Sequence, residues 1–440
     1  MTKNIRRLFK GVAWTLTAVL LINLAEPAGM GRVHAEEITI DGFTIQDGTL
    51  ISYTGEESGV KVPDEVTAIG SHVFSNNKTM TTLYLGENVT GIDYQYGMSA
   101  LTTIVLQNGE ADMQVSNSAF SSCDALTTLE VEKDVVTIPE ELYNVNTLQE
   151  INVEEGNTHY VSEDGVLLYR ENSASKLTLL KFPESSPITD YVIPADLHVK
   201  SIGTYAFYYC KNLVSVEIPE GVETIGYEAF SCCDSLKSIT MGPDVKALED
   251  YAFYYCKNLE TLTLSPVLED VLTGGSLLSG CGLKNLIVPQ AASYVPEEMY
   301  MHGTLENIQV AEGNPLYKSV DGVLYSADGK VLVSYPRGRK ATTYTVPEGP
   351  VEIGKEAFYY RESLEEIILP QSLEVLGDSA MEGATALKEL VLPAGVHTLE
   401  YDSLYNCKSM TSLTMSENLS EGSVNNNMLG SSDALTTIII

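Results

Sequence analysis

The chain has 440 residues, with 26 lysine and arginine residues against 60 aspartate and glutamate residues, and 44% of its residues are apolar. The apolar fraction is enough for a sizeable core, which excludes a wholly disordered chain. The net charge of −34 argues against nucleic acid and against an anionic membrane surface as partners, because both attract clustered lysine and arginine.

The first 35 residues have the pattern of a secretory signal peptide. A basic segment, residues 3–10, precedes an apolar run, residues 11–25, that is short for a membrane span. Val33 and Ala35 place small side chains where signal peptidase requires them, so we predict cleavage between Ala35 and Glu36. An uncleaved N-terminal anchor is the alternative. We expect a secreted or cell-surface protein with no membrane span after cleavage.

A repeat of 23 residues dominates the chain after residue 65. Segments that begin at Ile202, Ile225 and Leu248 align without gaps, and each carries an Ala-Phe pair, a Cys and a Leu at the same positions. A period of roughly 20–29 residues with an L-x-x-L-x-L core is the signature of a leucine-rich repeat solenoid. Counting the segments led by Leu or Met predicts thirteen units, whose strands start at Met80, Leu101, Leu126, Leu148, Leu213, Leu236, Leu259, Leu283, Leu305, Leu364, Leu387, Met410 and Leu435.

Each unit has a strand part and a second part. Apolar and polar residues alternate after the leading Leu, as in a half-buried strand, and a Pro such as Pro219 ends it. The A-F-x-x-C segment is expected to form one or two turns of helix. We therefore predict the α/β class: a leucine-rich repeat solenoid of about thirteen 23-residue units, each a strand plus a short helix, interrupted by β-hairpin inserts.

The inserts follow a pattern of their own. Asp164-Gly165 and Asp321-Gly322 each precede two apolar runs, which is a hairpin signal, and a third copy opens at Asp47-Gly48. We expect a signal peptide (1–35), an N-terminal β-hairpin cap (36–65), repeat module 1 (66–158), a hairpin insert (159–201), repeat module 2 (202–315), a second hairpin insert (316–352) and repeat module 3 (353–440).

Module 3 stops in the middle of a strand, at residues 436–440. Solenoid ends usually need a polar cap. We therefore expect either a fragment of a longer protein or an edge that another chain covers.

The I-G-x-x-A-F-x-x-C-x-x-L-x-x-I-x-I-P unit, the D-G-V-L-Y inserts and the leader resemble the BspA-like leucine-rich repeat family of bacterial surface and secreted proteins. The resemblance extends from about residue 43 to residue 440. It implies an adhesive or binding role, with host matrix proteins, host receptors or other bacteria as partners. The family has no fixed ligand residues, so the resemblance assigns no site.

The cysteines and histidines carry no recognisable catalytic or metal motif. Five scattered histidines remain after the leader, without the spacing of a zinc or nucleophile motif. We expect no catalysis, no cofactor and no metal; calcium bound by the acidic surface is the alternative. Six of the seven cysteines fall at or near one repeat position and are predicted to be buried small apolar residues, with disulfides between neighbouring units as the alternative: Cys123, Cys210, Cys233, Cys256, Cys281 and Cys407.

Two surfaces are candidates for partner binding. The outward positions of the strands are one, and a merely solvated face is its alternative: Tyr84, Glu130, Asn152, Glu217, Thr240 and Thr263. Paired tyrosines of the A-F-x-x-C segments are the other, and packing between units is their alternative: Tyr208, Tyr209, Tyr254, Tyr255, Tyr359 and Tyr360. The predicted function is binding of a host or bacterial surface protein or glycan. The alternatives are a self-associating structural surface protein, or the repeat region of a longer secreted enzyme.

Overall fold

The computed structural model describes residues 37–107, 113–117, 119–171, 176–268, 270–271, 277–292, 295, 301–420 and 427–440. The chain forms two compact units. Unit 1 reaches to Ser173 and includes Pro183–Ser185, and unit 2 comprises Ala174–Phe182 and Ser186–Ile440. The expected cleavage between Ala35 and Glu36 lies outside the described residues.

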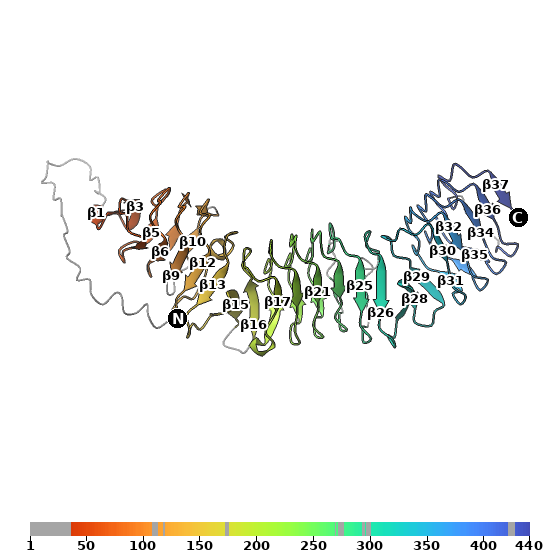
Figure 1. Ribbon diagram of the computed structural model, residues 1–440, viewed down its shortest axis with the longest axis horizontal. Coiled ribbons are helices and arrows are strands. Elements are labelled where there is room, and N and C mark those ends of the chain that lie inside the picture. Colours follow the sequence, from red (N-terminus) through yellow and green to blue (C-terminus); the bar gives the residue numbers. More distant parts are fainter. Residues whose placement is uncertain are drawn as a thin grey trace, which may run out of the picture. The chain divides into compact units, whose positions relative to one another are not determined.

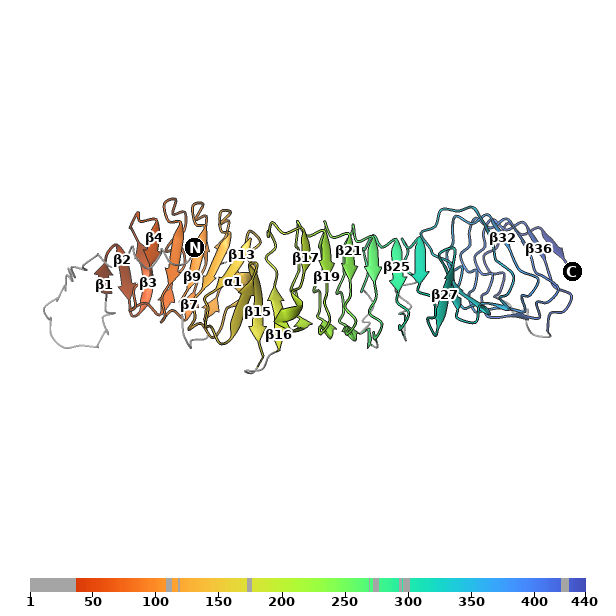
Figure 2. The same ribbon diagram turned by 60° about the horizontal axis from the view of Figure 1, so that its bottom comes forward.

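Each unit is a stack of coils, and each coil contributes one strand to a parallel ladder that we name the wide ladder. In unit 1 these strands are β4 (Gly59–Lys61), β6 (Thr82–Leu85), β9 (Thr103–Leu106), β12 (Thr128–Val131) and β13 (Glu150–Val153). In unit 2 a first group is β17 (Asp190–Val192), β19 (Ser215–Glu217), β21 (Ser238–Thr240), β23 (Thr261–Thr263), β25 (Asn285–Val288) and β26 (Asn307–Val310). A second group is β30 (Thr343–Thr345), β32 (Glu366–Ile368), β34 (Glu389–Val391), β36 (Ser412–Thr414) and β37 (Thr437–Ile439). Strands β17 to β26 lie side by side in chain order in both views (Figures 1 and 2).

A second parallel ladder, the narrow ladder, is built mostly from two-residue strands at the Ile-Gly position of the repeat. In unit 1 it contains β3 (Thr49–Tyr53), β5 (Ala68–Ile69), β7 (Gly91–Ile92) and β10 (Gln114–Val115). In unit 2 it contains β16 (Leu177–Lys181), β18 (Val199–Ile202), β20 (Thr224–Ile225), β22 (Ala247–Leu248) and β24 (Asp270–Val271), and separately β29 (Val331–Ser334), β31 (Glu352–Ile353), β33 (Val375–Leu376) and β35 (Thr398–Leu399). The apolar core lies between the two ladders.

Antiparallel strands occupy the segments that carry the Asp-Gly signals. β1 (Glu37–Ile40), β2 (Phe43–Gln46) and β3 form a meander, and β3 then joins the narrow ladder. β14 (Tyr160–Glu163) pairs with β15 (Val166–Arg170) across Asp164-Gly165. β27 (Tyr317–Val320) pairs with β28 (Val323–Ser326) across Asp321-Gly322, and β28 pairs with β29. β29 also pairs in parallel with β31. This antiparallel segment is therefore continuous with the narrow ladder.

The prediction of thirteen units was wrong, because sixteen strands form the wide ladder of the described residues. The three additional strands, β4, β17 and β30, precede Val62-Pro63, Ile193-Pro194 and Val346-Pro347. Each of them pairs in parallel with the next wide strand. They lack the leading Leu, so a count by Leu misses them.

The prediction of a short helix in each unit was also wrong. The helices of the described residues are α1 (Glu140–Tyr143) and the 3-10 helix η2 (Ala195–Leu197). Elsewhere the A-F-x-x-C segment is a turn, which we name the turn edge. In unit 1 its backbone forms the short parallel pair β8 (Gln95–Tyr96) and β11 (Phe120–Ser121).

Alternating hydrogen bonds explain why the turn edge is not helical. The amide of Phe207 donates to the carbonyl oxygen of Ala229 in the next coil. The following amide, that of Tyr208, donates to Tyr205, three residues back. This alternation places Tyr205 and Tyr209 in the left-handed region, each with φ of 56°. Positive φ recurs at the same two positions, four residues apart, at 72/76, 228/232, 251/255, 356/360 and 402/406. An α-helix cannot contain such residues, because its φ is about −63° throughout.

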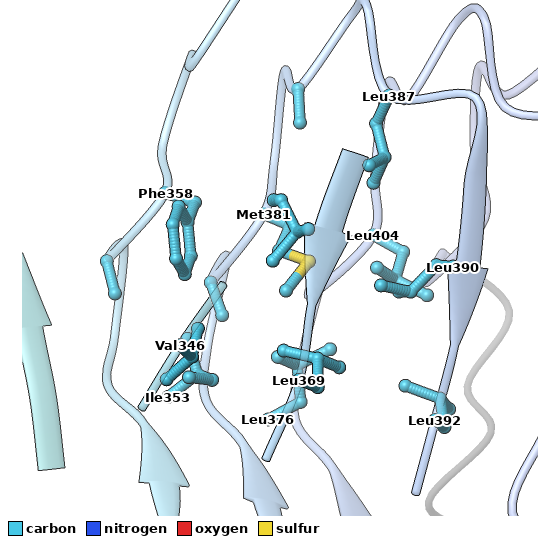
Figure 3. Close-up of a cluster of buried hydrophobic side chains, with 14 of the residues drawn as sticks. Val346, Ile353, Phe358, Leu369, Leu376, Met381, Leu387, Leu390, Leu392 and Leu404 are labelled. Atoms are coloured by element: carbon cyan, nitrogen blue, oxygen red, sulfur yellow. The ribbon is translucent and has the colours of Figure 1, made fainter. Parts of the chain in front are cut away.

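Equivalent apolar residues stack from coil to coil in the core. The rings of Phe207 and Phe230 are nearly parallel, with centroids 4.7 Å apart, and Phe253 follows at 5.7 Å from Phe230. Later in unit 2, Phe358 and Met381 occupy this position in successive coils, with Leu404 in the third (Figure 3). Each buried ring or aliphatic side chain contributes roughly 1.5–3 kcal/mol, so the stack stabilises each coil against its neighbours.

The six repeat-position cysteines are buried, which confirms that prediction. Their thiols also have a polar role. Those of Cys233, Cys256 and Cys281 donate to the carbonyl oxygen of the phenylalanine one coil earlier, at 2.8, 2.9 and 2.7 Å. All seven cysteines are free, so the disulfide alternative is not present in the structure. Burial raises the pKa of Cys407 to about 12.

Candidate functional site

The outward residues predicted on the strands fall into two columns, one in each unit. In unit 1, Lys61, Tyr84, Val105, Glu130 and Asn152 stand opposite one another on successive wide strands. The column is only partly open to solvent, since Tyr84, Glu130 and Asn152 are half-buried and Val105 is buried. Asn152 Nδ2 donates to Glu130 Oε1 at 3.1 Å. These two side chains therefore satisfy each other across the strands.

The column in unit 2 is more open. Glu217, Thr240 and Thr263 follow one another in register, and Glu217 and Thr240 are exposed. Val192 precedes Glu217 in the same column and is 58% exposed. This face mixes small polar and apolar groups without a cluster of charge or aromatic rings.

The turn edge of unit 2 carries a continuous group of aromatic side chains. Ring centroids of neighbouring members lie 4.5 to 5.8 Å apart, mostly edge to face. We name this group the tyrosine ladder: Tyr205, Tyr208, Tyr209, Tyr227, Tyr251, Tyr254 and Tyr255. Pairs with centroids at 4.5–7 Å and edge-to-face geometry are favourable beyond the area they bury, so the rings hold one another in place.

The tyrosine ladder is accessible as well as packed. Tyr205, Tyr209 and Tyr255 are 37%, 43% and 43% exposed, and the other four members are half-buried. The paired tyrosines of this group therefore pack against neighbouring rings and are also partly open to solvent. Tyr208, Tyr209, Tyr254 and Tyr255 were expected from the sequence. Sequence analysis missed the remaining three members, because one of them, Tyr227, precedes its Ala by two residues whereas the other two precede theirs directly.

Neighbouring groups raise the pKa of three members of the tyrosine ladder above the ordinary value of 10.0. A hydrogen bond with Glu228 raises the pKa of Tyr227 to about 12. Desolvation raises the pKa of Tyr254, and Cys232 raises that of Tyr209. Beside Tyr255, Lys257 Nζ lies 5.9 Å from the ring centroid and 3.4 Å from Asp234. The result is a neutral aromatic strip on a strongly acidic protein.

Tyr359 and Tyr360 occupy the equivalent turn in a later coil of unit 2, where the ring centroids are 4.6 Å apart. No ring contact among the described residues joins them to the tyrosine ladder. Instead the guanidinium of Arg337 lies 5.9 Å and 5.3 Å from their centroids. The structure thus separates the six predicted tyrosines into four that belong to the tyrosine ladder and two that contact an arginine.

Chemistry that requires a metal has no candidate centre in the described part of the chain. A search of these residues finds no group of three or more His, Cys, Asp or Glu side chains that could hold a metal ion. His302 is half-buried, and burial lowers its pKa. Its Nε2 lies 2.9 Å from the carbonyl oxygen of Leu278, so this side chain has a structural contact with the preceding coil. No helix in the described ranges is long and apolar enough to cross a membrane.

The comparison that decides the family is a match to the BspA-type leucine-rich repeat region, in six copies, at residues 51–164, 180–306 and 337–440. The chain belongs to this family. The match covers well over half of the sequence, and it includes the coils that carry the tyrosine ladder. The resemblance identified from the repeat unit and the inserts is thereby confirmed.

Solved leucine-rich repeat proteins are similar over most of their length. A leucine-rich cell-surface protein from Faecalibacterium prausnitzii is 19% identical, with 94% of this chain and 95% of that one covered and a TM-score of 0.37. A leucine-rich repeat protein from Bacteroides ovatus is 21% identical, with 91% and 90% covered and a TM-score of 0.43. The pneumococcal vaccine antigen PcpA is 16% identical, with 88% and 77% covered and a TM-score of 0.35. A search of curated proteins finds no match.

Proposed function

We propose that this BspA-type repeat protein is an exported, non-catalytic scaffold that binds a protein or glycan partner through the tyrosine ladder. The observation that carries the proposal is the contiguity of seven tyrosines over successive coils, three of them more than a third exposed. Tyrosine is enriched at interfaces because it offers a large, rigid surface with a polar tip.

The ladder is better suited to binding than the strand columns. Its rings are already held by one another and by the hydrogen-bonded turn edge, so little side-chain freedom is lost when a partner binds. The column in unit 2 presents flexible Glu217 and small Thr240 and Thr263, which offer less contact area. Export is supported by the pattern of the first 35 residues.

The test compares the full chain with two variants of matched size. Replacing Tyr205, Tyr209 and Tyr255 together with Ser removes the three most exposed rings. Replacing Glu217, Thr240 and Thr263 with Ala alters the strand column in the same unit. Fluorescently labelled proteins are applied to a glycan array and to immobilised fibronectin, laminin and collagen.

We expect the tyrosine variant to lose at least about tenfold in apparent affinity for any probe that the parent binds, since a few aromatic anchors usually dominate an interface. The column variant should bind as the parent does. Binding that survives in the tyrosine variant and fails in the column variant would place the partner on the strand face and contradict the proposal. Equal thermal midpoints of both variants show that the loss is not unfolding.

A further inference from the structure

A short basic loop, Pro336–Lys340, contrasts with the acidic character of the chain. It contains Arg337, Arg339 and Lys340 within five residues, and Arg361 lies close behind it, where its charge acts on Arg337. In the described part of the chain none of these four residues forms an ion pair with a carboxylate; the ion pairs found there involve lysine or histidine.

Two of the four basic groups are used by the fold. Arg361 is 1% exposed, and its guanidinium donates to the carbonyl oxygens of Tyr335 and Tyr359. Arg339 donates to the carbonyl oxygen of Asp321 and lies over the ring of Tyr335, 5.4 Å from its centroid. Arg361 is therefore closed to a ligand, and Arg339 is engaged by Asp321 and Tyr335.

Arg337 and Lys340 remain available. Arg337 is half-buried, and its guanidinium lies within cation–π range of Tyr359 and Tyr360. No hydrogen bond or ion pair of its guanidinium is found among the described residues, so its N–H donors can serve an anion. Glu356 and Glu382 lie near Tyr359, but Glu356 is paired with Lys355 at 3.5 Å. Lys340 is exposed, and it lines a cavity of about 290 Å³ together with Gly338.

The lining of this cavity indicates the kind of ligand. It consists of glycines and polar residues, with Lys257, Lys284 and Lys340 facing Glu260 and Glu306, and it includes no apolar side chain. Lys284 pairs with Glu260 at 2.7 Å, and Lys257 pairs with Asp234 at 3.4 Å, so Lys340 is the lysine there with no ion pair. Peptide-binding pockets depend on apolar anchors. A cavity of hydrogen-bonding groups beside unpaired cations instead suits sugar hydroxyls and an acidic substituent.

We propose that Arg337, Lys340 and the adjoining cavity form a binding site for an anionic polysaccharide, with its sulfate or carboxylate groups paired to the two cations and its hydroxyls in the cavity. Arginine forms paired hydrogen bonds to such groups, and lysine attracts them as a point charge. Neither Arg337 nor Lys340 is a member of the tyrosine ladder, but the cavity borders the ladder at Lys257, whose Nζ lies 5.9 Å from the ring centroid of Tyr255.

The test measures binding of the full chain to immobilised heparin at low ionic strength by biolayer interferometry. Hyaluronate, which carries carboxylates alone, and heparin, which also carries sulfate, distinguish the two anionic groups. Neutral dextran and polyglutamate serve as comparison polymers. The variants are Arg337→Gln with Lys340→Gln, Arg337→Lys, and Gly303→Tyr. Gly303 lines the cavity and has open space beside it, so the tyrosine would fill the cavity without a change of charge.

We expect heparin or hyaluronate to bind and the double variant to lose at least about tenfold in affinity, the effect of losing a charge-assisted contact. Arg337→Lys and Gly303→Tyr should each weaken binding, since one lacks the planar donor and the other blocks the cavity. Lys133→Gln is the control, an exposed lysine of unit 1 paired with Asp134.

Three results would overturn the proposal. They are no binding of either polysaccharide, equal binding by the double variant and the Lys133→Gln control, or polyglutamate binding as tightly as heparin. A ladder variant that keeps Tyr255 beside Lys257, Tyr205→Ser with Tyr209→Ser, should keep its polysaccharide binding at this site, so failure of one proposal can be told from failure of the other.

Discussion

The ring of Tyr360 lies directly against Gly383 of the next coil, so close that a Cβ on Gly383 would come within 2.8 Å of it. Both residues are in the left-handed region, at φ of 52° and 71°. Tyr255 and Gly280 repeat the arrangement at 2.9 Å. The glycine thus makes room for the aromatic side chain of the preceding turn.

Gly383→Ala should lower the free energy of unfolding by about 2–4 kcal/mol, because a strained φ and overpacking against the ring both contribute. Urea denaturation measures the change. Gly156→Ala is the matched control: Gly156 also has positive φ, at 97°, but a Cβ there meets nothing within 4 Å. It should cost about 1 kcal/mol. Equal losses in the two variants would show that the ring contact is unimportant.

Asn157 is a buried amide with all its hydrogen bonds satisfied. Its Nδ2 donates to the carbonyl oxygens of Glu132 and Val135, at 3.1 and 2.9 Å. Its Oδ1 accepts from the amides of His159 and Tyr160, both at 2.8 Å. Asn157→Asp should cost about 2–4 kcal/mol, since a carboxylate oxygen would face two carbonyl oxygens.

Asn212→Asp provides the control for that measurement. Asn212 is exposed and its Nδ2 makes one hydrogen bond, 2.9 Å from the carbonyl oxygen of Ser186. We expect a change below about 1 kcal/mol there, as is usual for surface substitutions. A loss as large as that of Asn157→Asp would mean that the buried amide has no special role.

Thiol reactivity should separate one cysteine from the other six. Cys232 is half-exposed, whereas the others are buried, and burial raises the pKa of Cys233 and of Cys407, the latter to about 12. Ellman's reagent at pH 8 should therefore label one thiol in the native protein, none in Cys232→Ser, and seven in denaturant. Rapid labelling of several thiols in the native protein would contradict the buried assignment.

The same shift predicts lower stability in alkali. The folded pKa of Cys407 is raised above its ordinary value of 9.0, so the unfolded chain loses its proton first. The contribution of the protonated Cys407 thiol to stability is fully present below about pH 9 and should be lost as the pH rises toward 12. Cys407→Ala should reduce this alkaline slope in denaturation curves measured between pH 8 and 11, and an unchanged slope would contradict the prediction.

Glu130→Gln should raise the melting temperature at neutral pH. Burial raises the pKa of Glu130 above its ordinary value of 4.5; the hydrogen bond from Asn152 offsets part of this, and the charge of Glu150 adds to it, so ionisation disfavours the folded state. Glutamine retains an oxygen for Asn152. The gain should therefore appear above about pH 5 and vanish at pH 3, where both states of the parent are protonated. An equal gain at pH 3 would attribute the effect to packing instead of charge.

Much of the solenoid could be read from apolar periodicity. The 23-residue spacing, the wide strands after each Leu and the buried cysteines follow from residues that recur in register. The wide strands that precede Val62, Ile193 and Val346 were missed because their register is set by pairing with the next coil and their own sequence lacks the leading Leu.

The turn edge could not be predicted in the same way. Several of its left-handed positions hold Tyr, Glu or Cys, for example Tyr205, Glu228 and Cys232, whereas Asn, a sequence signal for positive φ, stands at others such as 76 and 406. Hydrogen bonds to the neighbouring coil stabilise a conformation that these residues would not choose alone. For the same reason the full tyrosine ladder emerged only when successive coils were placed side by side.

The alternating hydrogen bonds of the turn edge have a consequence for how recognition by such arrays can change. Main-chain hydrogen bonds, such as that from the amide of Phe207 to the carbonyl oxygen of Ala229, recur from one turn to the next and do not depend on which side chains stand at the exposed positions. During evolution, exposed side chains at these positions can therefore be substituted one at a time while the main-chain conformation of the turn edge is retained. New specificities then arise by substitution, without insertions or a new core.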